Sequence, residues 1–261
     1  MPVSRNLYYS FHPDNNSEKP PVVLIHGAGG MNLSWPIEIR RLPGYNVYAI
    51  DLPGHGKSEK CDGQQTIGDY ARYLVQWLES IHIRRAVLIG HSMGGAIALT
   101  LAIHHPEYVV GLGLMGSGAR LRVHPELLNF AADQTTFYKT VDFLISHSFC
   151  SHTPKRLVEL VSQRLEATRQ SVLYGDLLAC DRFNVMDHLG AIQQETLVIC
   201  GADDEMTPVR YAQYLVSSIP HAQLNVISNA GHMVMLEQPH LVAENLLLFL
   251  QHVSFLPGEG N

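Results

Sequence analysis

The sequence has few of the features that mark disulfide-rich and metal-dependent proteins. Its four cysteines, Cys61, Cys150, Cys180 and Cys200, are dispersed without a Cys-x-x-Cys pair. This spacing favours buried reduced thiols over disulfides or a zinc site. No His-Glu-x-x-His motif occurs among the 15 histidines, so we expect no catalytic metal.

Positive charge and long apolar runs are also scarce. Lys and Arg total 18 against 24 Asp and Glu, a formal net charge of -6 without a basic run, which argues against nucleic acid as a partner. No apolar stretch approaches the roughly 18 residues that span a bilayer, and residues 1–6 lack the apolar core of a secretory signal. We therefore expect a cytoplasmic protein without stable membrane insertion. Its oligomeric state cannot be read from these features.

The chain does hold enough apolar material for one large α/β core. Of its 261 residues, 46% are hydrophobic, which is enough for a single core domain. Between residues 20 and 119, apolar strand patterns alternate with helical ones. Strands are predicted at 22–25, 47–50, 86–89 and 109–115, and a helix at 66–82. This alternation predicts a mostly parallel central sheet flanked by helices.

The pattern changes between residues 121 and 189. This stretch has helical periodicity and no convincing parallel strand, with Pro125 and Pro154 suited to early helix positions and Gly175 to a break. Strand and helix alternation resumes at 196–200. We predict a core domain in two parts at 1–120 and 190–255, a helical cap or lid inserted at 121–189, and a disordered tail at 256–261.

The strand pattern at 86–89 breaks at Gly90-His91-Ser92-Met93-Gly94 and continues into an apolar helix. A serine on a tight strand-to-helix turn presents its hydroxyl beyond the carboxyl edge of the sheet, so this run offers Ser92 as a nucleophile. Gly90 and Gly94 flank the serine because side chains there would collide across the turn. The pentapeptide alone fits an ordinary glycine-rich connection equally well. The strand before it and the helix after it favour the nucleophile.

A serine hydroxyl needs an imidazole to take its proton and a carboxylate to orient that imidazole. Asp203 and Asp204 follow the predicted strand at 196–200, and His232 lies in the loop after the next strand. Carboxyl ends of parallel strands share one sheet edge, so these residues are expected near Ser92. Asp51 also follows a strand, but the sequence Pro53-Gly54 after it favours a turn-forming role.

Five motifs in sequence order resemble the signatures of the α/β-hydrolase fold superfamily. They are His-Gly-Ala-Gly-Gly at 26–30, Asp-Leu-Pro-Gly-His-Gly-Lys-Ser at 51–58, the serine motif at 90–95, Gly201 to Pro208, and Gly-His at 231–232 with Glu-Gln-Pro at 237–239. The resemblance covers nearly the whole chain. It implies Ser92 as nucleophile, His232 as base and Asp204 as orienting acid, because the family acid typically lies three residues after such a glycine. Asp203 is the rival acid.

Acyl transfer also needs preorganised donors for the oxyanion of the tetrahedral intermediate. Met93 directly follows the nucleophile and supplies one amide at the start of a helix. The resemblance places the second donor after His26-Gly27, at Ala28, with Gly29 as the alternative. We expect His26 to brace that loop and His91 to pack behind the serine turn as a hydrogen-bonded histidine.

A dinucleotide or phosphate site is the competing interpretation of this glycine-rich loop. Residues 27–30 lack the full Gly-x-Gly-x-x-Gly pattern, and no Gly-Lys-Ser/Thr phosphate loop follows a strand. We therefore expect no cofactor.

These features predict a serine hydrolase that cleaves carboxylic esters with small to medium acyl chains through an acyl-enzyme on Ser92. The expected partner is a small-molecule ester with an apolar acyl group, because residues 127–149 are rich in Leu, Ile and Phe. Ordinary packing among helices explains most of those side chains equally well. The same triad also serves C–C bond hydrolases, lactonases, thioesterases and perhydrolases. A ligand sensor without turnover is the alternative from another functional class.

Overall fold

The computed structural model describes residues 3–15 and 17–253, which fold around an eight-stranded sheet in the order β1-β2-β4-β3-β5-β6-β7-β8. The strands are β1 (Val3–Ser4), β2 (Leu7–His12), β3 (Val22–Ile25), β4 (Val47–Ile50), β5 (Ala86–His91), β6 (Val109–Met115), β7 (Glu195–Gly201) and β8 (Ala222–Ile227). Neighbouring strands from β4 to β8 run parallel, whereas β2 runs antiparallel to both of its neighbours, β1 and β4. The predicted mostly parallel sheet is confirmed, and the antiparallel pair at its edge is an addition to the prediction.

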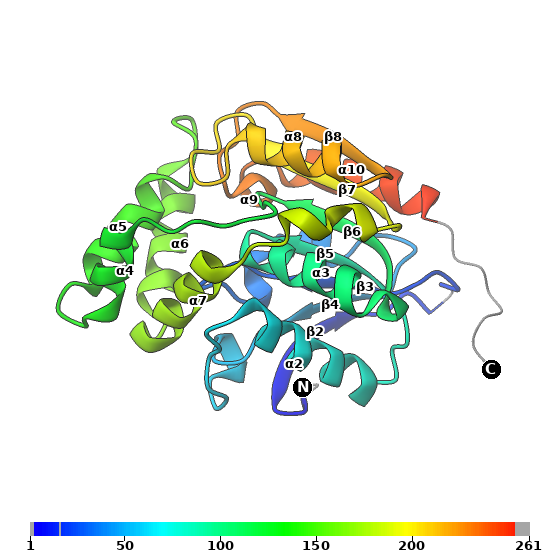
Figure 1. The fold of residues 1–261 in the computed structure, drawn as a ribbon, viewed down its shortest axis with the longest axis horizontal. Coiled ribbons are helices and arrows are strands. Elements are labelled where there is room, and N and C mark those ends of the chain that lie inside the picture. The colour runs from blue at the N-terminus through cyan, green and yellow to red at the C-terminus, as the bar shows by residue number, and fades with distance from the viewer. Residues whose placement is uncertain (1–2, 16, 254–261) are drawn as a thin grey trace.

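Helices cover both faces of this sheet (Figure 1). Along β3, Val23 and Ile25 contribute to one apolar cluster and Val22 and Leu24 to the other, because successive strand residues point to opposite faces. The first face is covered by α2 (Ile67–Ser80), α3 (Met93–His104) and α8 (Val209–Ser218), and the second by α1 (Ile37–Arg40), α9 (Val234–Glu237) and α10 (Pro239–His252). No helix within the described residues is long and apolar enough to cross a membrane.

Helix α2 shows how local sequence sets these elements. The Thr66 hydroxyl accepts from the Asp69 amide at 3.1 Å, which caps the helix where its first amides have no intrahelical acceptor. Its apolar stripe, which includes Tyr70, Leu74 and Leu78, is fully buried against the sheet. The helix predicted from this pattern is confirmed, and it begins and ends within two residues of the expected limits.

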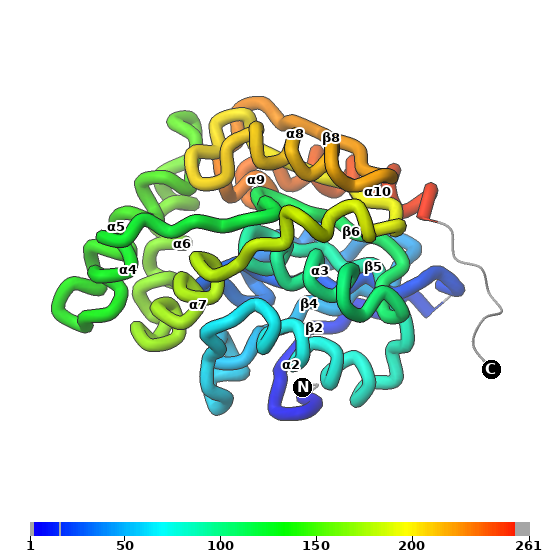
Figure 2. The backbone as a smooth tube through the Cα atoms, in the orientation of Figure 1, coloured from blue at the N-terminus to red at the C-terminus, as the bar shows by residue number. Residues whose placement is uncertain are grey.

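Four helices lie between β6 and β7, and we call them the insert. They are α4 (Pro125–Ala132), α5 (Phe137–Ser146), α6 (Lys155–Glu166) and α7 (Gln170–Arg182). In Figure 2 the insert lies to the left of the sheet, in green. Its two ends meet. The Val185 amide donates to the Ala119 carbonyl at 2.8 Å, and Arg120 pairs with Asn184 in an isolated antiparallel β-bridge. This closure supports the proposed division at 121–189. The tail predicted at 256–261 lies outside the described residues.

The predicted break at Gly175 is wrong, because Gly175 lies inside the continuous helix α7. A Cβ at this position would stand 2.6 Å from the Gln64 carbonyl oxygen. Glycine is therefore required by the close approach of α7 to the core, and not by the end of a helix.

Short 3₁₀ helices complete the fold at η1 (Asn32–Ser34), η2 (Gly56–Ser58), η3 (Pro106–Tyr108) and η4 (Met186–Ala191).

Candidate active site

Ser92 lies on a strained turn between β5 and α3, with φ 52° and ψ −116°. A non-glycine residue in such a conformation costs about 1–3 kcal/mol, so the surrounding structure must hold it. The Ser92 amide donates to the Met115 carbonyl at 2.8 Å, and the Ser117 hydroxyl donates to the Ser92 carbonyl at 2.9 Å. Strand β6 and the residues after it therefore fix the turn.

The two flanking glycines allow three elements to meet at this turn. A Cβ on Gly90 would lie 2.2 Å from the Gly94 carbonyl oxygen, and a Cβ on Gly94 would lie 2.1 Å from the carbonyl oxygen of Ile25 in β3. No side chain fits at either position unless β5, α3 and β3 move apart. The collision across the turn that the sequence predicts is confirmed for Gly90, whereas at Gly94 the obstacle is strand β3.

His232 and Asp204 form a buried hydrogen-bonded pair. His232 Nδ1 is 3.0 Å from Asp204 Oδ2. The carboxylate also accepts from the amides of Met206 and Thr207 at 2.9 and 2.8 Å and from the Thr207 hydroxyl at 2.8 Å. Because every other partner donates to Asp204, the carboxylate is an acceptor and Nδ1 of His232 carries the proton. Nε2 is then the basic nitrogen.

The electrostatics of this pair favour an ionised acid. Burial alone would raise the pKa of Asp204, but His232 and the donors of Thr207 outweigh burial and lower that pKa below its ordinary value. Asp203, by contrast, has an exposed side chain, and its amide donates to the Ala230 carbonyl. Of the two candidate carboxylates, Asp204 is the one in contact with His232.

His91 braces the loop that carries His232. His91 Nε2 donates to the His232 carbonyl at 3.0 Å. Burial, together with the neighbouring His232, lowers the pKa of His91 to about 3, so the ring is neutral at physiological pH. The expectation that His91 is a buried, hydrogen-bonded histidine is confirmed.

His26 fixes the loop at 27–30 by a similar device. Its Nε2 accepts from the Leu52 amide at 3.0 Å, so the proton is on Nδ1, which donates to the Gly27 carbonyl at 2.8 Å. Burial, followed by the nearby His55, holds the pKa of His26 well below its ordinary value. The carbonyl and amide of a trans peptide point in opposite directions. The Ala28 amide therefore points away from the His26 ring.

The two expected alternatives for the second oxyanion donor differ in their contacts. The Gly29 amide donates to Asp176 Oδ2 at 2.9 Å, so it is engaged with the insert. Ala28 lines the same cavity as Ser92. Met93 begins α3, and the first amides of a helix have no intrahelical acceptor.

Asp51 is buried and accepts from the amides of Asn32 and Lys57, so it ties two loops together.

Ser92, His232 and Ala28 line one cavity of about 140 Å³ between the sheet edge and the insert. The insert contributes Leu144, Ile145, Val161, Arg164, Leu165, Leu177 and Cys180 to its wall. Among the apolar residues predicted at 127–149, Leu144 and Ile145 reach the cavity, whereas Leu127 and Phe137 pack inside the insert. The cavity wall is thus mainly apolar, with Arg122 and Arg164 as cations.

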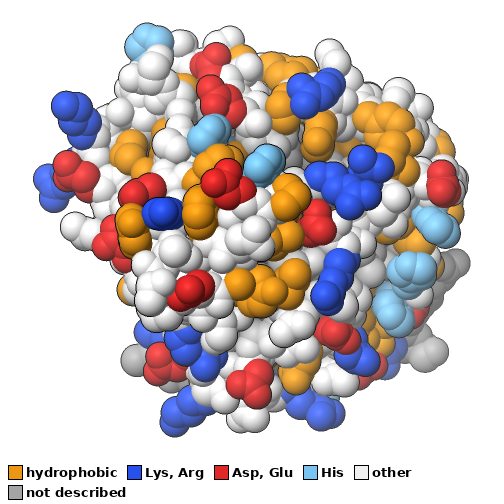
Figure 3. Space-filling view, turned by 60° about the vertical axis from the view of Figure 1, so that its left-hand side comes forward, with side chains coloured by type: hydrophobic (Ala, Val, Ile, Leu, Met, Phe, Trp, Pro, Cys, Tyr) orange, Lys and Arg blue, Asp and Glu red, His pale blue; other side chains and the backbone are white. Residues whose placement is uncertain are grey.

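The described residues contain no group of three or more His, Cys, Asp or Glu side chains placed to hold a metal ion. Figure 3 shows acidic, basic and hydrophobic side chains interspersed over the face that carries the insert. Charge of one sign does not dominate that face. The four cysteines are free thiols; Cys150, Cys180 and Cys200 are buried as expected, whereas Cys61 is only half-buried.

Sequence reasoning missed a buried polar cluster beneath the insert. Asp176 of α7 contacts His55 Nε2 at 2.8 Å and accepts a short hydrogen bond from the Tyr70 hydroxyl. Burial would lower the pKa of His55, but Asp176 outweighs burial and raises it. Burial and Asp176 also raise the pKa of Tyr70 well above its ordinary value, so Tyr70 remains a donor. The sequence carried one unused signal, an aspartate within a helix stripe that is otherwise apolar.

The His55–Asp176 pair predicts a pH-dependent free energy of unfolding. The folded-state pKa of His55 is raised, so the stabilisation is complete below the unfolded value of about 6.5 and is lost as pH rises through the folded value. A His55→Asn variant lacks this contribution at every pH. We expect the Tm difference between wild type and variant to be largest near about pH 6 and to shrink toward about pH 9. Thermal denaturation followed by circular dichroism measures it, and a constant difference would contradict the assignment.

The chain matches the alpha/beta hydrolase fold family over residues 20–239. It is 31% identical over 245 residues to the 2-hydroxy-6-oxo-6-phenylhexa-2,4-dienoate hydrolase of Comamonas testosteroni, covering 86% of this chain and 85% of that protein. It is 27% identical over 253 residues to the pimeloyl-[acyl-carrier protein] methyl ester esterase of Vibrio vulnificus, covering 91% and 97%. A thermophilic esterase structure from Thermogutta terrifontis superimposes with TM-score 0.85 at 25% identity, covering 95% and 94%. With its motifs, sheet and serine turn, the chain belongs to the alpha/beta hydrolase fold family.

Proposed function

We propose that this hydrolase cleaves carboxylic esters through an acyl-enzyme on Ser92. The observation that carries the proposal is that Ser92, on its strained turn, lines one cavity with His232, whose Nδ1 is bound to Asp204. A nucleophile, a base with a fixed tautomer and an orienting carboxylate are the parts that acyl transfer from a serine needs. The Vibrio vulnificus relative that is named a methyl ester esterase supports this substrate class.

In acylation, Ser92 Oγ attacks the ester carbonyl while His232 Nε2 takes the hydroxyl proton. Asp204 stabilises the imidazolium that forms and keeps Nδ1 protonated. The oxygen of the tetrahedral intermediate accepts from the amides of Met93 and Ala28, which we propose as the oxyanion donors. Collapse breaks the bond to the alcohol, and His232 gives its proton to the leaving alkoxide oxygen.

Deacylation repeats the same steps with water. His232 Nε2 takes a proton from the water as the water oxygen attacks the acyl carbon, and the second tetrahedral intermediate uses the same two amides. When it collapses, Ser92 Oγ leaves and regains the proton from His232. The acid is released, and the enzyme returns to its starting state without a cofactor.

The cavity size favours short acyl groups. In another protein, an engineered apolar cavity of about 150 Å³ holds a benzene molecule, and the cavity described here measures about 140 Å³. We therefore expect kcat/KM to be higher for p-nitrophenyl butyrate than for the octanoate. A steady-state series with the acetate, butyrate and octanoate measures this preference. Sustained turnover supports the esterase, whereas a single stoichiometric burst supports the non-catalytic sensor.

A second candidate is hydrolysis of an acidic substrate other than an open-chain ester. The relative in Comamonas testosteroni is named for an oxo-dienoate, and two cations, Arg122 and Arg164, lie on the cavity wall described above. The same serine and histidine serve C–C bond hydrolysis and lactone opening. Oxo-dienoate, lactone and thioester substrates assayed beside the nitrophenyl series decide between these reactions. The highest kcat/KM identifies the reaction class.

A further inference from the structure

We propose that Asp176 is a positioning residue that sets the oxyanion loop at residues 27–30 from the insert. The inference deepens the proposed function and rests on it. Asp176 lies in α7, far along the chain from this loop, and its side chain is fully buried. Its Oδ2 accepts the Gly29 amide at 2.9 Å. The loop that offers the Ala28 amide is therefore bound directly to the helices above it.

Gly29 is held by the insert on both sides. Besides the bond from its amide to Asp176, its carbonyl accepts from the Thr168 hydroxyl at 3.2 Å. Its φ is +63°, and a Cβ there would lie 2.4 Å from Leu165 Cδ1. The left-handed backbone favours glycine here, and a Cβ would also displace the end of the Leu165 side chain.

Ala28 lies between two fixed peptide planes. The plane before it is fixed because the Gly27 carbonyl accepts from His26 Nδ1 and from the Gly30 amide at 3.0 Å. The plane after it is fixed because the Gly29 amide donates to Asp176. The Ala28 amide lies in the first of these planes. With both planes held, the φ and ψ angles of Ala28 are determined, so the second plane keeps the first from turning about Ala28. The core sets one plane and the insert sets the other.

Asp176 is itself oriented by two core elements. Tyr70 of α2 donates to Oδ1, and His55, from the loop after β4, contacts Oδ2. His55 Nδ1 faces the Pro53 carbonyl at 3.0 Å, so both ring nitrogens face acceptors and both carry protons. The pair is thus an imidazolium and a carboxylate, both fully buried.

A buried ion pair is a weak source of stability, because removing two charges from water costs about as much as their attraction returns. Apolar side chains of the same volume would join α7 to the core at least as well. The ion pair differs from such packing in one respect, which is the directed acceptor that it presents to the Gly29 amide. The cluster therefore serves to hold the Asp176 carboxylate in the direction of the Gly29 amide. An oxyanion donor that is misdirected weakens the transition state more than the bound substrate.

The test compares Asp176→Ala and Asp176→Asn with wild type in the full chain. Four quantities are measured, namely kcat and KM for p-nitrophenyl butyrate, and by calorimetry the Kd for butylboronic acid and for butyrate. The boronic acid forms a tetrahedral adduct on a serine and places an oxygen in the oxyanion site, whereas butyrate reports ground-state binding. For Asp176→Ala we expect kcat to fall roughly 10-fold to 100-fold, less than or equal to the loss on deleting an oxyanion donor. The boronate Kd should rise by a similar factor, with KM and the butyrate Kd within about threefold of wild type.

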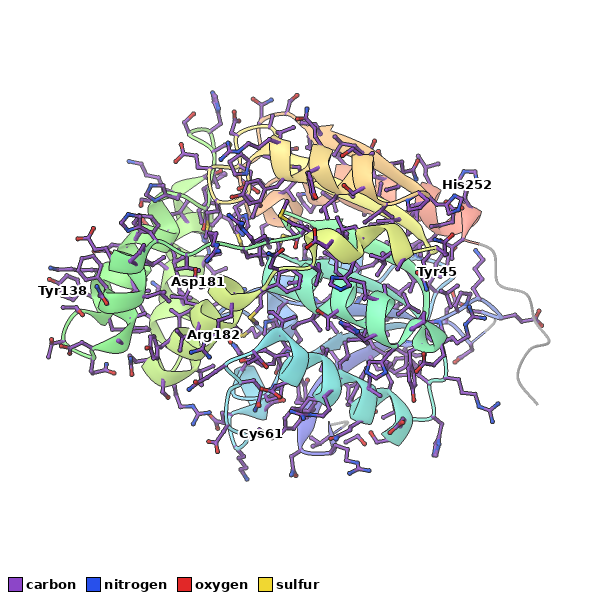
Figure 4. All side chains as sticks on the ribbon, in the orientation of Figure 1. Tyr45, Cys61, Tyr138, Asp181, Arg182 and His252 are labelled. Atoms are coloured by element: carbon purple, nitrogen blue, oxygen red, sulfur yellow. The ribbon has the colours of Figure 1, made fainter. Side chains whose placement is uncertain are left out.

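Two control variants separate positioning from stability. Val141→Ala removes buried methyl groups inside the insert and away from the cavity, so it should lower Tm without changing the boronate Kd. Tyr138, labelled in Figure 4, lies on the outer side of α5 and is 60% exposed. Tyr138→Ala should leave all four quantities unchanged.

Asp176→Asn retains an oxygen for the Gly29 amide, so we expect it to recover part of the loss. If Asp176→Ala does not fold, Asp176→Asn and Tyr70→Phe provide the test, and both should weaken boronate binding relative to butyrate. Unchanged boronate binding in the folded variants would overturn the positioning role. A wild type that binds the boronate more tightly than Asp176→Ala but does not hydrolyse the ester would contradict the substrate class and support the role of Asp176.

Discussion

Ser92→Ala is expected to lower kcat/KM for p-nitrophenyl butyrate by roughly 10⁴-fold or more. The alanine side chain has no nucleophile, and only the oxyanion donors and substrate binding remain to accelerate attack by water. The fold should be unchanged, because alanine carries the same Cβ as serine at the strained position and the backbone bonds of the turn do not involve the hydroxyl. Steady-state assays and circular dichroism measure the two expectations.

Ser148→Ala provides the matched control. Ser148 lines the same cavity, and its hydroxyl donates to the Leu144 carbonyl within the insert. If Ser92 alone is the nucleophile, Ser148→Ala should keep turnover within a few-fold of wild type. Near-full ester turnover in Ser92→Ala, or a comparable loss in Ser148→Ala, would remove Ser92 from the mechanism.

The parts of the site that could be predicted depend on neighbours in the sequence. The Ser92 turn was predictable because the strand before it, the two glycines and the helix after it all lie within 20 residues, and Gly90 has a local steric cause. His91 was expected to be hydrogen-bonded because it adjoins this turn, whereas its partner, the His232 carbonyl, is 141 positions away. Asp204 was separated from Asp203 by spacing within the resembled motif, and the structure adds the contact with His232.

The parts that could not be predicted depend on contacts between distant residues. Asp176 meets Tyr70 across 106 positions and His55 across 121, and no local pattern marks such a contact. Periodicity placed Tyr70 on an apolar stripe, which is correct, but it carries no information on what its hydroxyl contacts. Strand β2 was missed because its residues are mostly half-exposed at the sheet edge, where the apolar alternation is weak.

Asp204→Asn should lower kcat by roughly 10⁴-fold, whereas Asp203→Asn should leave it within a few-fold of wild type. The asparagine amide preserves the shape of the side chain but can present an N–H to His232 Nδ1. The imidazole then carries its proton on Nε2, so it cannot take the proton of Ser92. Asp203→Asn is the matched control. The Asp203 side chain is next in the sequence and exposed, and its substitution removes the same charge.

Asp204→Asn and Asp203→Asn should also differ in their stability toward acid. The pKa of Asp204 is lowered in the folded state, so its stabilisation is present above the unfolded value of about 3.9 and is lost as pH falls through the folded value. Acid unfolding of wild type therefore includes protonation of Asp204, and this contribution is missing from Asp204→Asn at every pH. We expect the Tm difference between wild type and Asp204→Asn to shrink on acidification below about pH 4, and Asp203→Asn to follow wild type. Equal kcat losses in both variants would show that the two carboxylates act together, in contradiction to the single contact between Asp204 and His232.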